Sequence, residues 1–299
     1  MKIVNIAGGL GNQMFQYAFA MMLQQRYPDE CVMIDTQHYH SLFFKRFGSV
    51  NLHNGYEIDT IFCNATLKQA GFSDLRKVTY YIPNYIVSRI ARRLLPKRAS
   101  EFISPYSENY SYNEAVFTND DRYYEGYWQC AAYYNDIRPL LRHTFAPPAP
   151  NEYNSSMIDR INNCSSVGIH VRRGDYKYAP ELNGICTTTY YANAIEKATE
   201  DGEKRTFFVF SNDITWCKEN LHSMAPGHDM VFVEGNKGKD SCWDMFLMTY
   251  CKELIIANSS FSWWGAFLNR RAKAVYAPYP WIHRDCSIEI YPPEWVKLS

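Results

Sequence analysis

Residues 167–175 read Val-Gly-Ile-His-Val-Arg-Arg-Gly-Asp, and this stretch indicates the fold more clearly than any other. Its alternating valine and isoleucine residues are typical of a short buried strand. Two arginines, a glycine and an aspartate follow at once, so we expect the strand to open into a polar loop. In an open α/β sheet, ligands bind just beyond the carboxyl ends of the strands. The adjacent guanidinium groups of Arg172 and Arg173 match phosphate oxygens in geometry. An Arg–Asp pair that closes a surface loop is the alternative.

Strand and helix patterns alternate through the second half of the chain. Strands are predicted at 166–171, 206–210, 230–233, 253–257 and 273–277. Helices are predicted at 188–200, 214–222, 240–251 and 262–270. This alternation implies a parallel sheet with right-handed crossovers.

The first half opens in the same way. Residues 3–7 form a predicted strand, a glycine-rich turn follows, and apolar residues at helical spacing continue to residue 27 before a second strand at 31–34. The proline-rich stretch 145–151 is the best candidate for a linker. The sequence therefore predicts an α/β fold. It would have two Rossmann-like domains, residues 1–145 and 152–299, that face a cleft, with the last residues packing back on the first half.

Composition narrows the class of protein. The chain has 299 residues and a formal net charge of zero, which gives no global case for a nucleic-acid partner. No apolar stretch approaches the ~20 residues that span a bilayer, and no signal-peptide pattern is present at the start. The nine cysteines lack metal-ligand spacing and are expected to be reduced. We therefore expect a cytoplasmic enzyme.

The glycine-rich turn after the first strand is the first candidate ligand loop. Gly9, Gly11 and Asn12 lie between a strand and a helix, where a backbone can approach a ligand closely. The spacing departs from G-x-G-x-x-G, so a dinucleotide-dependent enzyme is the weakest hypothesis. A tight turn that needs glycine only for packing is the alternative.

Ser211, Asn212 and Asp213 follow a second predicted strand. A carboxylate there can accept hydrogen bonds from N1 and N2 of guanine. The alternative is a helix N-cap, because Asn and Asp are favoured caps and a helix follows.

Ser259, Ser260, Phe261 and Ser262 follow a third predicted strand and open a helix. Hydroxyl groups and free backbone N–H groups at a helix N-terminus form an anion site; an elaborate cap beside core tryptophans is the alternative. Because the three loops follow parallel strands, we expect them to meet at one edge. Arginines, hydroxyls and a carboxylate predict a nucleoside diphosphate site without a metal, and no D-x-D tripeptide is present to hold one.

Four segments together resemble a known family. They are Gly-Gly-Leu-Gly-Asn-Gln at 8–13, His-Val-Arg-Arg-Gly-Asp at 170–175, Ser-Asn-Asp at 211–213 and Asn-Ser-Ser-Phe-Ser-Trp-Trp-Gly at 258–265. In this order they resemble glycosyltransferase family 11, the α-1,2-fucosyltransferases, in particular the bacterial type. The resemblance implies a GT-B fold, GDP-fucose as donor, inversion at the anomeric carbon, and neither metal nor cofactor. It also implies transfer to the 2-hydroxyl of a terminal galactoside, on an oligosaccharide or a lipid-linked glycan.

The resemblance also implies roles for individual residues. Arg172 would clamp the β-phosphate, His170 and Asp213 would contact guanine, and Asn12 would lie near the fucose. Ser259 to Ser262 would line the pyrophosphate. The general base stays open between Asp175, Asp244 and Glu181, and Asp175 would otherwise only orient Arg172. Another nucleotide-sugar transferase of the same fold and a non-catalytic nucleotide- or glycan-binding module are the competing functions.

Residues 86–98 form a basic amphipathic segment. Ile86, Val87, Ile90, Leu94 and Leu95 fall on one predicted helical face, and Arg89, Arg92 and Arg93 lie opposite, flanked by Lys97 and Arg98. Such a helix can lie on an anionic membrane surface. A helix packed on the protein with a solvated basic face is the alternative.

Overall fold

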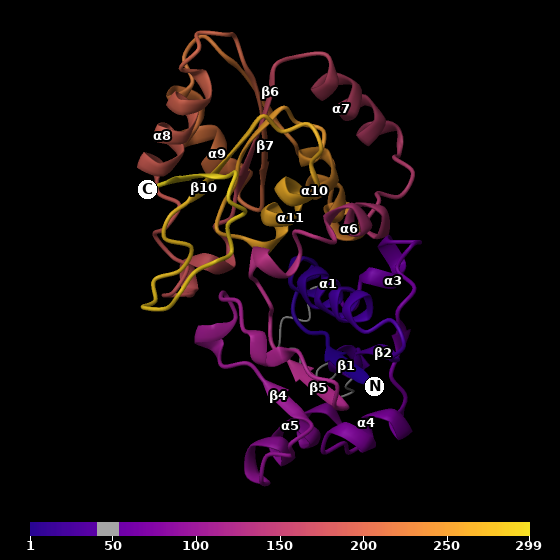
Figure 1. Ribbon diagram of the computed structural model, residues 1–299. Coiled ribbons are helices and arrows are strands. Elements are labelled where there is room, and N and C mark those ends of the chain that lie inside the picture. The colour runs from indigo at the N-terminus through magenta and orange to yellow at the C-terminus, as the bar shows by residue number, and fades with distance from the viewer. Residues whose placement is uncertain (41–53) are drawn as a thin grey trace. The chain divides into compact units, whose positions relative to one another are not determined.

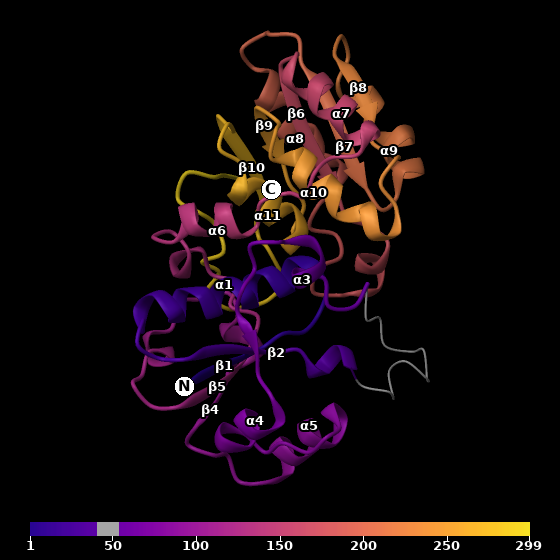
Figure 2. The same cartoon turned by 90° about the vertical axis from the view of Figure 1, so that its right-hand side faces the viewer.

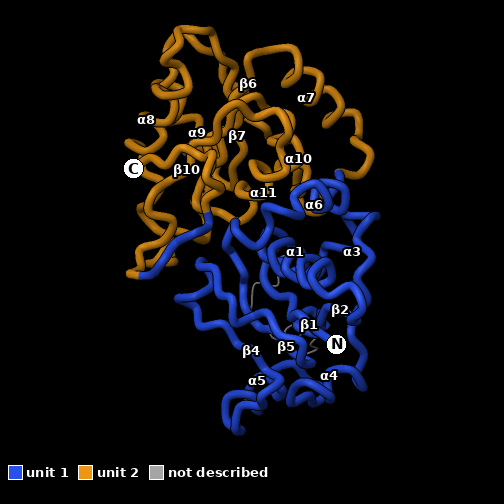
Figure 3. Tube along the Cα trace, viewed as in Figure 1, with its two compact units in different colours: residues 1–146, 286–290 blue, residues 147–285, 291–299 orange. Residues whose placement is uncertain are grey.

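The computed structural model describes residues 1–40 and 54–299, which form two compact units (Figure 3). Unit 1 consists of residues 1–146 and 286–290, and unit 2 of residues 147–285 and 291–299. The boundary near residue 146 falls in the proline-rich stretch. Each unit is built on its own parallel sheet, which confirms the predicted fold class.

Unit 1 contains a five-stranded sheet in the order β3-β2-β1-β5-β4, and all its strand pairs are parallel. The strands are β1 (Lys2–Asn5), β2 (Val32–Asp35), β3 (Lys68–Gln69), β4 (Glu101–Ile103) and β5 (Arg122–Glu125). The helices are α1 (Leu10–Arg26), α3 (Ile58–Ile61), α4 (Phe72–Val78), α5 (Tyr85–Leu94) and α6 (Arg138–Thr144). Helix α1 covers one face of the sheet, and α4 and α5 lie on the other (Figures 1 and 2).

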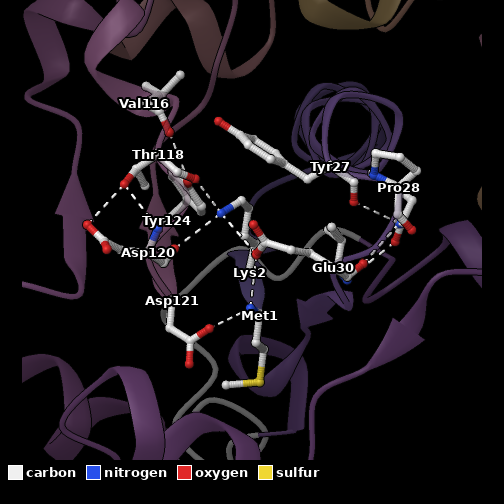
Figure 4. Close-up of polar contacts among 12 residues, drawn as sticks. Met1, Lys2, Tyr27, Pro28, Glu30, Val116, Thr118, Asp120, Asp121 and Tyr124 are labelled. Atoms are coloured by element: carbon white, nitrogen blue, oxygen red, sulfur yellow. Dashed lines mark hydrogen bonds and ion pairs between the residues drawn. The ribbon is translucent and has the colours of Figure 1, made fainter.

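Lys2 begins β1 with a side chain that is completely buried. Its Nζ donates to the carbonyls of Thr118 at 2.6 Å and Asp120 at 3.1 Å, and it pairs with Glu30 at 3.1 Å (Figure 4). All three ammonium protons therefore have acceptors, which offsets the cost of removing the charge from water. These bonds tie the first strand to the turns that precede β2 and β5.

Unit 2 contains a six-stranded sheet in the order β11-β10-β9-β6-β7-β8. The strands are β6 (Ser166–Val171), β7 (Thr206–Ser211), β8 (Asp229–Phe232), β9 (Glu253–Ile255), β10 (Ala274–Pro278) and β11 (Val296–Leu298). The helices are α7 (Glu152–Asn162), α8 (Thr188–Thr199), α9 (Ile214–Asn220), α10 (Cys242–Met248) and α11 (Ser260–Leu268). Helices α8 and α9 supply one apolar layer against β6 and β7, while α7, α10 and α11 gather on the other face (Figure 1).

The observed elements differ from the predicted ones mainly at their ends. Helix α11 starts at Ser260, two residues before its predicted start, because the serines belong to its first turn. The segment predicted as one helix at 240–251 begins instead with a 3₁₀ turn at Gly238–Ser241 and ends at Met248. The short strand β11 has no clear sequence pattern and joins the sheet by pairing with β10.

The amphipathic segment forms α5, but the side that packs on unit 1 is not the apolar side, as the alternative of a packed helix with a solvated basic face required. Arg92, predicted on the solvated basic face, is buried, and its Nη2 pairs with Glu125 at 3.1 Å. Leu94, from the predicted apolar face, is 80% exposed. The ion pair with a strand residue far along the chain decides which side of the helix packs on the sheet. No helix in the described parts of the chain is long and apolar enough to cross a bilayer.

Candidate active site

Parallel pairing in unit 2 places three polar loops at one edge of the sheet. Strands β6 and β7 pair in register up to Val171 and Ser211, and β6 also pairs with β9, where Ile169 lies opposite Ile255. The loops that begin at residues 172, 212 and 256 therefore leave the sheet side by side. This is the edge at which ligands bind in open α/β folds.

Arg172 is held in place by Asp175 within its own loop. Its Nε and Nη2 donate to the two carboxylate oxygens of Asp175 at 2.8 and 2.9 Å. This paired geometry orients the guanidinium plane. Two of the five N–H donors of Arg172 are used in it, so three are left for another acceptor.

Arg173 connects the first loop to the second. Its backbone N–H donates to Asn212 Oδ1 at 3.0 Å, and its Nε donates to Asp213 Oδ2 at 3.3 Å. Its guanidinium lies 4.1 Å from the ring centroid of Trp216, a cation–π contact. Lys177 Nζ also donates to Asp213 Oδ2, at 3.2 Å.

Asp213 is the N-cap of α9, where its Oδ1 accepts from Trp216 N at 3.3 Å. The Ser211 hydroxyl supports it by accepting from the backbone N–H of Asp213 at 2.9 Å. Burial opposes ionisation of this carboxyl, but hydrogen bonds from Lys177, Trp216 and Arg173 outweigh that effect and lower its pKa. The helix-cap geometry is thus present, and the proposed contact with guanine stays a prediction.

His170 lies at the end of β6 with only 4% of its surface exposed. Burial, reinforced by the charge of Arg172, lowers its pKa to about 3, so the imidazole is neutral at physiological pH. Its Nδ1 is buried and has no hydrogen-bond partner. An unpaired buried nitrogen costs about 1–3 kcal/mol, and such groups call for an explanation. Because this atom has almost no exposed surface, a ligand could bond to it only after a local rearrangement.

The serine-rich loop forms the start of α11. Ser259 is the N-cap residue but makes no side-chain cap bond, and the Ser262 hydroxyl contacts the carbonyls of Ala257 and Ser259, both at 3.2 Å. Ser262 therefore stabilises the turn. The first-turn N–H groups of α11 have no acceptor within the helix, and together with the helix dipole they favour an anion.

Tyr176 joins this loop to the arginine loop. Its hydroxyl donates to the carbonyl of Asn258 at 3.2 Å, and the guanidinium of Arg172 lies 5.6 Å from its ring centroid. Burial raises the pKa of Tyr176 to about 12, so the hydroxyl remains a neutral donor. The edge therefore holds Arg172, Arg173 and Lys177 against two carboxylates, beside an open helix N-terminus.

Two further carboxylates from the sequence prediction are bound elsewhere. Asp244 Oδ1 accepts from Asn236 Nδ2 at 2.9 Å, and burial raises the pKa of this carboxyl to about 7. Glu181 pairs with Arg284 at 2.5 Å. The structure thus joins Asp175 directly to Arg172 and connects Asp244 and Glu181 to other segments.

In unit 1, the glycine-rich loop forms a compact hydrogen-bonded turn. Gly8 has φ +89°, which favours glycine, and a Cβ atom there would lie 2.9 Å from Asn12 Nδ2. Gly9 is the N-cap residue of α1, and Gly11 lies in the first turn of that helix. Asn12 Oδ1 accepts from Gln129 Nε2 at 2.8 Å, which orients the asparagine.

Sequence reasoning missed four residues of these loops: Tyr176, Lys177, Trp216 and Gln129. Tyr176 and Lys177 directly follow the Arg-Arg-Gly-Asp segment in a 3₁₀ turn at Asp175–Tyr178, so proximity in sequence offered a signal. Gln129 offered none, because it lies 117 residues from Asn12. Within residues 1–40 and 54–299, no three His, Cys, Asp or Glu side chains lie close enough to hold a metal ion. The absence of a metal requirement stays a prediction.

Comparisons with known proteins identify the family of the chain. The family model described as Glycosyl transferase family 11 matches residues 104–299. The Alpha-1,2-colitosyltransferase of Escherichia coli is 33% identical over 304 residues, which cover 99% of this chain and 98% of that protein. The O-antigen biosynthesis glycosyltransferase WbnK of Escherichia coli is 27% identical and covers 98% and 99% of the two chains.

More distant similarities extend to animal enzymes and to a crystal structure. The Galactoside alpha-(1,2)-fucosyltransferase 2 of Oryctolagus cuniculus is 28% identical over 141 residues, 44% of this chain and 39% of that protein. The crystal structure of fucosyltransferase NodZ from Bradyrhizobium superposes with a TM-score of 0.51 at 13% identity, over 92% of both chains. At that identity the superposition supports the fold alone. The family match and the similarity along the full chain show that this protein is a glycosyltransferase that belongs to glycosyl transferase family 11.

Proposed function

We propose that this enzyme transfers L-fucose from GDP-fucose to the 2-hydroxyl of a terminal galactoside, with inversion at the anomeric carbon and without a metal. The observation that carries the proposal is the cationic edge of unit 2, where Arg172 is held by Asp175 beside the open N-terminus of α11. The similarity to relatives whose names state an alpha-1,2 or alpha-(1,2) transfer supports the linkage.

The donor would bind to unit 2 through its charged and polar parts. The free donors of Arg172, with Arg173 and the first-turn N–H groups of α11, would contact the diphosphate. The neutral imidazole of His170, near the end of β6, would contact the base. The Ser259 and Ser260 side chains at the start of α11 would lie along the pyrophosphate.

The reaction is an in-line displacement at C1 of the sugar. The acceptor oxygen forms the new bond to C1, the bond from C1 to the β-phosphate oxygen breaks, and its electron pair leaves with GDP. Negative charge therefore grows on the phosphate while the sugar gains oxocarbenium character. Preorganised donors aimed at that charge lower the barrier, and one such donor is typically worth about 10²–10³ in kcat.

A base must also accept the proton of the acceptor hydroxyl. Asp244 has a pKa of about 7, in the range that suits a base at neutral pH, but Asn236 holds its carboxylate. Asp175 lies next to Arg172 and acts through that pair as a positioning residue. Asp175→Asn should therefore lower kcat without shifting the pH dependence of kcat. If Asp244 is the base, Asp244→Asn should remove the acidic limb of the pH dependence of kcat.

A second donor is favoured by one comparison. The relative that matches along the full chain at 33% identity is named a colitosyltransferase. Colitose is L-fucose without its 3-hydroxyl, so the same diphosphate contacts would serve both donors.

We also expect the protein to act in the cytoplasm.

Donor and acceptor can be tested together. Purified protein would be incubated with labelled GDP-fucose or GDP-colitose and a panel of β-galactosides, and the product linkage would be determined by NMR. We expect an α-1,2-fucosyl product and GDP release that requires an acceptor. Exclusive use of GDP-colitose would select the second donor. GDP binding with no transfer to any acceptor would favour a binding module, and an Arg172→Ala variant serves as the inactive control.

A further inference from the structure

Helix α5 exposes an apolar row to solvent. Val87, Ile90 and Leu94 are 43%, 50% and 80% exposed, and their spacing of three and four residues places them on one side of the helix. Amphipathic helices on globular proteins normally turn that side toward the core.

The opposite side of α5 is polar and is held firmly against unit 1. Arg92 pairs with Glu125 at 3.1 Å, and its guanidinium lies 5.3 Å from the ring centroid of Tyr123. The Ser88 hydroxyl exchanges two bonds of 2.8 Å with the backbone of Ile82, and Asn84 caps the helix by accepting from two backbone N–H groups. The apolar row is thus directed outward by specific contacts.

The row lies in a segment of the chain that is rich in exposed apolar side chains. In the described parts of the chain, seven large aliphatic or phenylalanine side chains are exposed, and six of them lie between residues 72 and 95. These six are Phe72, Ile82, Val87, Ile90, Leu94 and Leu95. Phe72 begins α4, and the other five lie in α5 or within three residues of it, so these exposed side chains concentrate on two helices that lie on the same face of the sheet (Figure 1). Exposed apolar side chains in such numbers mark an interaction site.

Positively charged residues are frequent in the same segment of the chain. Residues 75–100 include seven arginines and lysines and no aspartate or glutamate, although the whole chain has a formal net charge of zero. One of the seven, Arg92, is buried, but Arg76, Lys77, Arg89, Arg93 and Lys97 are all exposed. Asp74 lies 3.9 Å from Lys77, and cations far outnumber acidic groups in this part of unit 1. Exposed apolar side chains among many cations complement a surface that is apolar within and negatively charged at its rim, which describes an anionic bilayer.

We propose that α5 docks unit 1 on an anionic lipid membrane. Val87, Ile90 and Leu94 enter the boundary between headgroups and acyl chains, and Arg89, Arg93 and Lys97 contact the lipid phosphates. Helices α4 and α5 lie together on the face of the sheet away from α1, so one surface of unit 1 carries both (Figures 1 and 2). This inference goes beyond the proposed function and holds whichever donor and acceptor the enzyme uses.

The test is co-sedimentation of the full chain with vesicles of phosphatidylcholine alone or with about one third phosphatidylglycerol. Wild-type protein should partition onto the anionic vesicles. A basic residue at such a surface contributes about five-fold in partitioning. The triple variant Arg89→Gln, Arg93→Gln, Lys97→Gln should therefore bind roughly a hundred-fold more weakly. The variant Ile90→Ser, Leu94→Ser should lose roughly ten-fold or more, because fewer apolar groups enter the bilayer.

A matched control changes charge by the same amount elsewhere. Lys197, Lys204 and Lys273 are exposed in unit 2. Their triple change to glutamine should leave partitioning within about two-fold of wild type, because these residues lie outside the proposed contact. Since all the substituted side chains are exposed, melting temperatures should stay close to that of wild type. Fluorescence of a Leu94→Trp variant gives an independent readout, a blue shift on anionic vesicles.

Several outcomes would overturn the proposal. They are failure of the wild type to bind anionic vesicles, binding that survives either α5 variant, and equal weakening by the unit 2 control. A dimer in sedimentation equilibrium that Ile90→Ser, Leu94→Ser dissociates would assign the row to a second copy of the chain.

Discussion

Asp213 occupies a position with two interpretations, and asparagine at that position separates them. In the structure, the carboxylate caps α9 through Oδ1 and pairs with Arg173 and Lys177 through Oδ2. A carboxylate offers about four acceptor sites, and these contacts use three of them. About one site is left for guanine. The structure therefore leaves room for at most one hydrogen bond from the base to Asp213, where the sequence suggested two.

The magnitude follows from that count. Losing one charge-assisted bond to guanine costs about 1.5 kcal/mol, at the lower end of the range for charged groups, so the affinity for GDP should fall roughly ten-fold. Stability should change little, because Asn caps helices about as well as Asp does. The ion pairs that are lost involve side chains 23–48% exposed, and such surface pairs contribute between about 0 and 1 kcal/mol.

Calorimetric titration measures the affinity, and a melting curve run beside it measures the stability. Inosine diphosphate, which lacks the 2-amino group of guanine, shows which donor is read: if Asp213 binds that group, wild type should prefer GDP and Asp213→Asn should not. Asp213→Ala should add the loss of the cap, about 1 kcal/mol of stability. Unchanged affinity for GDP and unchanged preference over inosine diphosphate in Asp213→Asn would refute the base contact and leave Asp213 as scaffold.

Three other predictions concern catalysis and pH. Arg172→Ala should lower kcat by at least about 10² in a labelled-transfer assay. Arg172→Lys should restore little activity, because lysine cannot reproduce the two bonds of 2.8 and 2.9 Å to Asp175. Near-normal turnover of Arg172→Ala, or an equal loss in the exposed control Arg160→Ala, would contradict the phosphate clamp. Activity should survive EDTA, and loss of turnover that Mn²⁺ or Mg²⁺ restores would show a metal requirement. Asp244 has a folded-state pKa of about 7, raised from 3.8 by burial, so its contribution to stability is present below about pH 4 and is lost as the pH rises through 7. In urea unfolding, Asp244→Asn should therefore be more stable than wild type at pH 8 and equally stable near pH 4. If the two proteins were equally stable at both pH values, the pKa of the Asp244 carboxyl would not be raised.

Local patterns were sufficient for five of the six strands in the sheet of unit 2, all except β11. Strand β6 was predicted at the same residues that it occupies, and β7 to within one residue. Strand β6 is buried at every position, as expected for a central parallel strand that is covered on both faces. The polar segments that follow each strand then had to share one edge, since the strands are parallel. This argument alone brought Arg172, Asp213 and Ser259 to the same side of the sheet.

Local sequence patterns could not predict the contacts between segments that lie far apart in the chain. The sequence showed that residues 86–98 are amphipathic, but a helical period does not say which side packs inward. The structure decides it through the pair between Arg92 and Glu125, and a buried arginine requires such a partner. The partner lies 33 residues away on another element.

At the candidate site, too, local patterns predicted some features and contacts between distant segments decided others. The sequence by itself determined the parallel α/β units, the loops that carry the charges, and the family motifs, because apolar periodicity and strand-end residues are local properties of the chain. Only the tertiary structure decided that Asp213 is shared between a helix cap and two cations, that Gln129 orients Asn12, and that α5 turns its apolar side outward. Those outcomes depend on which partners reach a polar group once it is buried, and folding brings those partners together from distant parts of the chain.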